Sequence, residues 1–94
     1  MLKFKINKDK SDERFEFMEC PIDNWMITII KPLESPMPMC SVFAKVNLLY
    51  NWNTGGYVEI WNHLATNYEE AKEIAEKIYK TIYNFNLVTP WKEQ

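Results

Sequence analysis

The sequence predicts an α+β fold: an antiparallel sheet of about five strands in a meander, with one C-terminal amphipathic helix packed on one face. Segments in the first part of the chain alternate apolar and polar residues, as half-buried strands do. The segment Asn53-Thr-Gly-Gly56 has the composition of a hairpin turn, and residues 67–84 carry apolar side chains at helical spacing. With 94 residues, the chain is expected to form a single domain over 1–94, with residues 90–94 as a tail.

The N-terminal part is predicted to form three strands and a loop. Residues 2–7 alternate apolar and polar side chains, and residues 14–20 resume this pattern after a charged turn. We expect Pro21 to end the second strand, because proline cannot donate a hydrogen bond to a strand ladder. Residues 25–31 are rich in β-branched and aromatic types, which predicts a third strand. Three prolines within the segment 32–39 then predict an extended loop.

The next two strands are predicted to form a hairpin. Residues 41–52 form the longest strand candidate, the turn at 53–56 supplies positive-φ positions, and residues 57–64 return antiparallel. One face of this hairpin is expected to pack against the helix and to build the core. The apolar residues assigned to that face are Val42, Val46, Leu48, Val58, Ile60 and Leu64.

A helix is predicted from about Asn67 to Asn84. The sequence Thr66-x-x-Glu69 matches a capping box, in which the hydroxyl and the carboxylate accept hydrogen bonds from free N–H groups at the helix start. Pro90 marks the end of regular structure. The apolar stripe of this helix consists of Ala71, Ile74, Ala75, Ile78, Ile82 and Phe85.

Composition and charge exclude several classes of protein. Thirteen acidic and eleven basic residues give a net charge of −2, and Arg14 is the only arginine, whereas nucleic-acid binders carry a basic stripe with several arginines. The longest apolar run is far shorter than a membrane helix, and the N-terminus lacks the apolar segment of a secretion signal. We therefore expect a cytoplasmic protein that binds neither nucleic acid nor a membrane, with Cys20 and Cys40 as reduced thiols.

No residue pattern points to a catalytic, metal or cofactor site. His63 is the only histidine, and neither Cys20 nor Cys40 lies in a nucleophile motif or shows the paired spacing of a zinc site. Gly55-Gly56 joins two strands and is interpreted as a turn instead of a phosphate loop. We predict no catalytic residue, no metal and no cofactor. An enzyme that uses Cys40 or His63 is the alternative, which activity surviving both alanine replacements would exclude.

Aromatic residues are concentrated on the sheet face opposite the predicted core. One helix covers only one face of a small sheet, so the other face exposes its aromatic side chains unless a partner covers them. The alternative is that sheet curvature and the loop 32–39 fold over this face and form a second small core. The candidate partner-binding residues are Phe43, Lys45, Leu49, Tyr57, Glu59, Trp61 and His63.

These observations favour a non-enzymatic protein-binding domain that acts by occlusion or bridging. Its partner is expected to be another protein, a second copy of the chain as a homodimer, or both. Abundant Asn, Lys and Ile with scarce Arg suggest an AT-rich source. This suits a phage- or mobile-element-encoded inhibitor of a host defence system, of the anti-CRISPR or anti-restriction type, in the bacterial cytoplasm.

The alternative function is a small-ligand or nucleotide-binding domain. In that hypothesis the side chains of Lys45, Tyr57, Trp61 and His63 line the ligand site, and the site lies at a homodimer seam. Stabilisation by a nucleotide in a thermal-shift screen would distinguish this hypothesis from protein binding, because a ligand of the folded state raises the melting temperature.

One segment resembles a known family. The turn Gly55-Gly56-Tyr57, followed by Thr66-x-x-Glu69-Glu70-Ala71 at a helix start, is similar to the partial RNase-H-like domain of HicB-type antitoxins. The three N-terminal strands have no counterpart in that pattern, so no functional residue is carried over to this chain.

Overall fold

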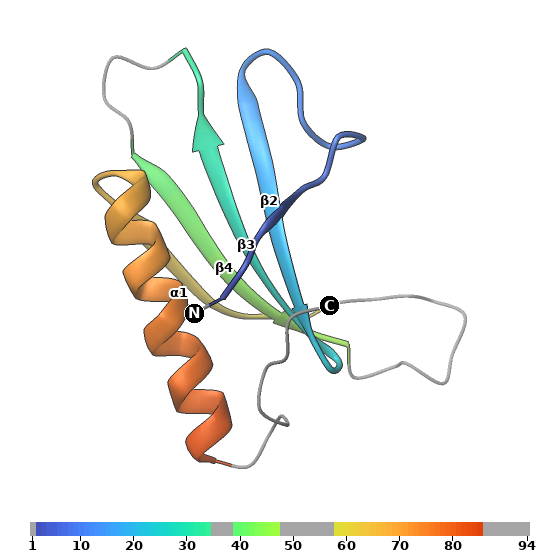
Figure 1. Ribbon diagram of the computed structural model, residues 1–94, viewed down its shortest axis with the longest axis vertical. Helices are drawn as coiled ribbons and strands as arrows, with labels where there is room; N and C mark the ends of the chain where they lie inside the picture. The colour runs from blue at the N-terminus through green and yellow to red at the C-terminus, as the bar shows by residue number, and fades with distance from the viewer. Residues whose placement is uncertain (1, 35–38, 48–57, 86–94) are drawn as a thin grey trace.

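The computed structural model describes residues 2–34, 39–47 and 58–85 (Figure 1). The strands pair in the order β1-β2-β3-β4-β5, and every neighbouring pair is antiparallel. The predicted α+β fold, a five-stranded antiparallel meander with one C-terminal helix, is therefore confirmed. The elements are β1 (Lys5–Ile6), β2 (Phe15–Ile22), β3 (Trp25–Pro32), β4 (Cys40–Val46), β5 (Val58–Ala65) and α1 (Tyr68–Asn84).

The core lies between α1 and one face of the sheet. Helix α1 crosses the sheet over β4 and β5 and also contacts β3 (Figure 1). Ala71 and Ala75 are fully buried, and these small side chains allow the helix to approach the strands closely. The remaining buried apolar residues of this core include Met18, Cys20, Ile22, Trp25, Ile27, Ile29, Cys40, Val42, Ala44, Val46, Ala65, Ile78 and Ile82.

Strand β2 continues past Pro21, so the prediction that this proline ends the strand is wrong. Pro21 pairs with Met26, and Ile22 pairs with Trp25 across a two-residue turn. In such a hairpin the closing pair, here Ile22 and Trp25, exchanges backbone hydrogen bonds, whereas the next pair, Pro21 and Met26, does not. The missing N–H of Pro21 therefore removes no hydrogen bond to β3. Asp23, at φ 53°, supplies the left-handed residue that the turn requires.

The helix begins one residue later than the capping box predicts. Asn67 is the N-cap, and its side-chain oxygen accepts a hydrogen bond from the backbone N–H of Glu70 at 2.8 Å. The carboxylate of Glu70 in turn accepts from the backbone N–H of Thr66 at 3.2 Å and from its hydroxyl at 3.1 Å. Asn67 therefore takes the N-cap role predicted for Thr66, and Glu70 bonds to the residue before the N-cap instead of to the N-cap N–H of a capping box.

Several predictions lie outside the described residues. These include the turn at 53–56, the strand segment 48–52 and the tail at 90–94. Among the candidate binding residues, the same holds for Leu49 and Tyr57.

Candidate partner-binding site

The structure divides the candidate binding residues between the two faces of the sheet. Directly paired residues of antiparallel strands share a face. Lys45 pairs with Glu59 and lies with Phe43 on the face opposite α1, as predicted. Trp61 pairs with Ala44 and His63 pairs with Val42, so these two lie on the face that packs against α1. The prediction that all of these residues form one surface is therefore wrong.

A β-bulge causes this division. The register between β4 and β5 shifts between Ala44 and Lys45, where β5 contains one extra residue. Because side chains alternate with a period of two, a shift of one residue moves every later side chain to the other face. The predicted alternation therefore holds at Glu59 and is inverted at Trp61 and His63.

The same inversion explains an error in the predicted core. Leu64 pairs with Ser41, on the face away from α1, and its side chain is 66% exposed. Ile60, the extra residue of the bulge, is 45% exposed. Val58 pairs with Val46 on the helix side, as predicted, and is nevertheless 45% exposed, which the inversion does not explain. All three were expected to be buried against the helix. The described part of β5 thus carries three well-exposed aliphatic side chains.

Trp61 takes part in the core on the helix side. Its ring stacks on Trp25 of β3, with 5.8 Å between the centroids, and its side chain is partly buried. Ala44 lies between these two strands, and its small side chain leaves room for the indole to reach across β4. The indole of Trp61 is held in place on one side and faces the helix on the other.

A groove runs between β5 and α1 beside this indole. Its volume is about 280 Å³. The isoleucine side chains and the indole make it mainly apolar, whereas the lysine, histidine and threonine add hydrogen-bond donors. The residues that line it are Trp61, His63, Ile74, Lys77, Ile78 and Thr81.

Strand β5 is also an open edge of the described sheet. Within residues 2–34, 39–47 and 58–85, this eight-residue strand pairs with β4 alone. An edge strand presents backbone N–H and C=O groups that can pair with another strand, and proteins usually protect such edges with lysine, proline or a covering segment. Strand β5 contains neither lysine nor proline; the features of this kind that it carries are Glu59 and the bulge next to it.

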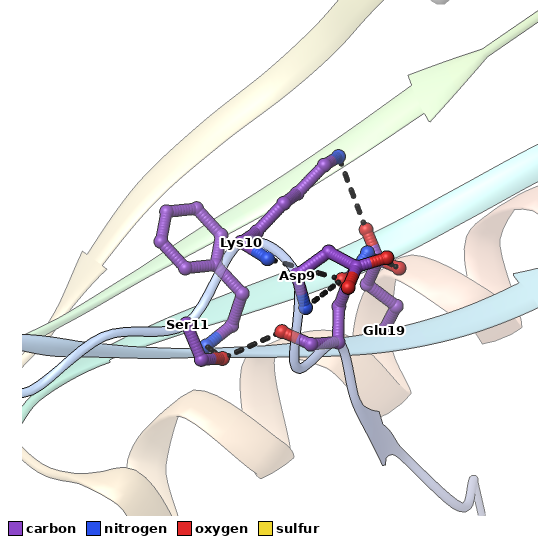
Figure 2. Close-up of polar contacts among 6 residues, drawn as sticks. Asp9, Lys10, Ser11 and Glu19 are labelled. Atoms are coloured by element: carbon purple, nitrogen blue, oxygen red, sulfur yellow. Dashed lines mark hydrogen bonds and ion pairs between the residues drawn. The ribbon is translucent and has the colours of Figure 1, made fainter.

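At the opposite edge of the sheet, β1 contains only two residues, and the turn that follows it contacts β2 (Figure 2). Ser11 accepts a hydrogen bond from the backbone N–H of Phe17 in β2 at 2.9 Å and donates to the carbonyl of Asn7 at 2.7 Å. Lys10 also reaches Glu19 of β2, with 3.4 Å between Nζ and Oε2. Residues 7–11 therefore fold back on β2. Within the part of the chain that the structure describes, the two edge strands differ in length: β1 has two residues and β5 has eight.

The face opposite α1 is less exposed than predicted. Phe43 is partly buried, and the ammonium group of Lys45 lies 5.6 Å from the centroid of its ring. Thr28, which pairs with Phe43 in the middle of this face, is only 4% exposed. The chain itself covers the centre of this face, so the exposed apolar side chains of the hairpin lie along β5 instead.

The cysteines have the environment of structural residues. Cys20 and Cys40 are buried thiols on the helix side of the sheet. Burial raises the pKa of the Cys40 thiol above its ordinary value of 9.0, and the charge of Lys31 opposes this shift. A thiol that stays protonated is a poor nucleophile. Among the described residues, no group of three or more His, Cys, Asp or Glu side chains is arranged to hold a metal ion.

Comparison with known proteins adds no relative. No protein-family model matches the sequence, and no curated protein or solved structure is significantly similar to it. In the described part of the chain, no helix is long and apolar enough to cross a membrane.

Proposed function

We propose that this protein is a non-enzymatic protein-binding domain that accepts an extended segment of its partner along β5. The observation that carries the proposal is the combination of an open, lysine-free edge strand with an adjoining groove. In strand addition, backbone hydrogen bonds supply affinity, and pockets for alternate side chains supply specificity.

The groove and the edge fit this binding mode. A strand added beside β5 directs alternate side chains toward α1, into the space beside Trp61 and His63. Its remaining side chains point to the other face, where Ile60 and Leu64 are exposed. Both sets of side chains would thus find apolar neighbours on this chain.

The biological role follows from the binding mode as a prediction. A protein that occupies a partner's strand or bridges two partners blocks the surface it covers, which is how a small inhibitor acts by occlusion. We propose that it works in the cytoplasm, and that its target is a host defence complex if the source is a phage or mobile element. Restored plating of a phage on a host that carries a defence system would test that role.

Site-specific photocrosslinking tests the binding surface. A photoreactive phenylalanine analogue replaces Ile60 in β5. The matched control carries the analogue at Leu33, after the end of β3, because the two side chains are similarly exposed, at 45% and 47%. We expect adducts with a discrete protein, another or a second copy, from position 60 and none from position 33. Equal or absent adducts at both positions would contradict the proposed function.

A small-ligand site is the second candidate, in a changed form. Trp61 and His63 line the same groove, whereas Lys45 lies on the other face of the sheet, so the predicted ligand site does not assemble as expected. The groove volume of about 280 Å³ is near the lower end of the range for ligand pockets. A thermal-shift screen with nucleotides tests it: a rise in melting temperature that Trp61→Ala abolishes would support a ligand, and no rise would exclude nucleotides.

A further inference from the structure

We infer that the strand that pairs with β5 is β5 of a second copy of this chain, antiparallel about a two-fold axis at Asn62. The inference rests on the proposed function, because it names the partner for the same edge. It makes the partner subunit a contributor to the groove and joins the two sheets into one.

The pattern of β5 is self-complementary in this register. With Asn62 opposite the partner's Asn62, Ile60 lies opposite the partner's Leu64, and Leu64 opposite the partner's Ile60. Ile60 is the extra residue at the bulge; because it directly precedes Trp61 on the helix side, alternation along the strand places it with Asn62 and Leu64 on the other face. Ile60 and Leu64 are 45% and 66% exposed in the single chain. Cross-strand apolar pairs of this kind stabilise a sheet, and two of them would form across the axis.

The helix side of the strand is complementary as well. In the same register Trp61 lies opposite the partner's His63, and both residues face the groove between β5 and α1. The partner's His63 and Trp61 therefore extend into the space that Ile74 and Thr81 line on this chain. The groove of each subunit is completed by side chains of the other.

Charge does not oppose this pairing. Glu59 is the only acidic residue of β5, and it lies opposite the partner's Ala65, away from the partner's Glu59. A register centred on Trp61 instead places Ile60 opposite the partner's Asn62, which leaves Ile60 without an apolar partner. The register at Asn62 is the one that matches apolar with apolar residues on the exposed face.

A cross-strand disulfide tests the geometry of the axis. Residue 62 is exposed, and at the axis it lies opposite its own copy, within the separation that a disulfide spans. We expect Asn62→Cys to form a covalent dimer under mild oxidation. Glu59→Cys is the matched control, because its two copies lie six residues apart along the paired strands. Linkage through position 59 and none through position 62 would overturn the register.

Solution mass with a charge-rescue pair tests the dimer itself. Light scattering should give a dimer for the unmodified chain and a monomer for Ile60→Lys/Leu64→Lys. The two lysines should raise the dissociation constant of the dimer by more than about tenfold. Ile60→Lys/Leu64→Glu should dimerise again, because it places opposite charges across the axis.

The outcomes separate this inference from the proposed function. A monomeric chain that forms adducts with a different protein at position 60 overturns the second copy and leaves strand addition standing. A monomeric chain with no adduct at position 60 overturns both. A dimer that survives Ile60→Lys/Leu64→Lys shows another interface and also overturns the inference.

Discussion

Trp61 stacks on Trp25 with 19° between the ring planes and 5.8 Å between their centroids. The contact joins β3 to β5 across the small side chain of Ala44 in β4. It also places Trp61 on the helix side, so the indole both supports the core and forms one wall of the groove.

The first prediction concerns this stacked pair. In a double-mutant cycle, Trp25→Ala and Trp61→Ala should show a coupling free energy of about 0.5–1.5 kcal/mol, because aromatic pairs contribute that much beyond their burial. Urea unfolding of the two single variants and the double variant measures it. Phe43→Ala is the control, since Phe43 lies on the opposite face and should be additive with Trp25→Ala. Additive effects for the two tryptophans would contradict the assignment.

The second prediction tests the inverted face of β5. Ile27→Ala should lower the free energy of unfolding by about 2–5 kcal/mol, because this side chain is fully buried. Leu64→Ala should change it by less than about 0.5 kcal/mol in a monomeric sample, because Leu64 is on the surface. Dilute samples or the background Ile60→Lys keep association out of the measurement. A loss at Leu64 as large as that at Ile27 would show that Leu64 belongs to the core.

The third prediction concerns the start of α1. Asn67→Ala should destabilise the protein by about 0.5–2 kcal/mol, because it leaves the backbone N–H of Glu70 without its cap. Thr66→Ala should have a smaller effect, because the backbone N–H of residue 66 still donates to Glu70. Thermal unfolding of both variants ranks them, and the reverse order would restore Thr66 as the cap.

The fourth prediction concerns acid stability. Backbone N–H groups of Phe15 and Arg14 donate to the Asp12 carboxylate, and these bonds hold the pKa of Asp12 below its ordinary value of 3.8. The folded state thus binds this proton less readily than the unfolded state, so the contribution of Asp12 is present above pH 3.8 and is lost as pH falls through the lowered pKa.

Urea unfolding from pH 5 to pH 2 checks this dependence. Asp12→Ala should be less stable than the unmodified protein at pH 5, and the difference should shrink toward pH 2. A difference that stays constant over this range would show that the carboxylate charge has no part in it.

The elements themselves could be predicted because local patterns specify them. The β-branched and aromatic composition of residues 25–31 and the helical spacing of the apolar stripe from Ala71 to Ile82 are local signals, and the structure forms the expected strand and helix there. The cap was displaced by one residue because Thr66 and Asn67 are both good caps, and backbone geometry chooses between them.

The candidate site could be predicted only in part, because it depends on register. The pairing of Lys45 with Glu59 follows simple alternation, whereas the bulge after Ala44 turns Trp61 and His63 toward the helix. A bulge is hard to detect in the sequence, because apolar and polar residues alternate in the same way before it and after it. Only the pairing with the neighbouring strand shows that one residue is extra. The sequence also does not show how the turn after β1 packs, because that depends on the hydrogen bond from Phe17 in β2 to the hydroxyl of Ser11.

By itself, then, the sequence determined an acidic α+β chain with too many aromatic and aliphatic side chains for one covered face. Only the tertiary structure decided where the surplus lies: Trp61 packs against the core, and Ile60 and Leu64 are exposed on β5, the last strand of the described sheet. The physical reason is that local periodicity sets what each segment forms, whereas one extra residue in β5 sets which way its side chains point.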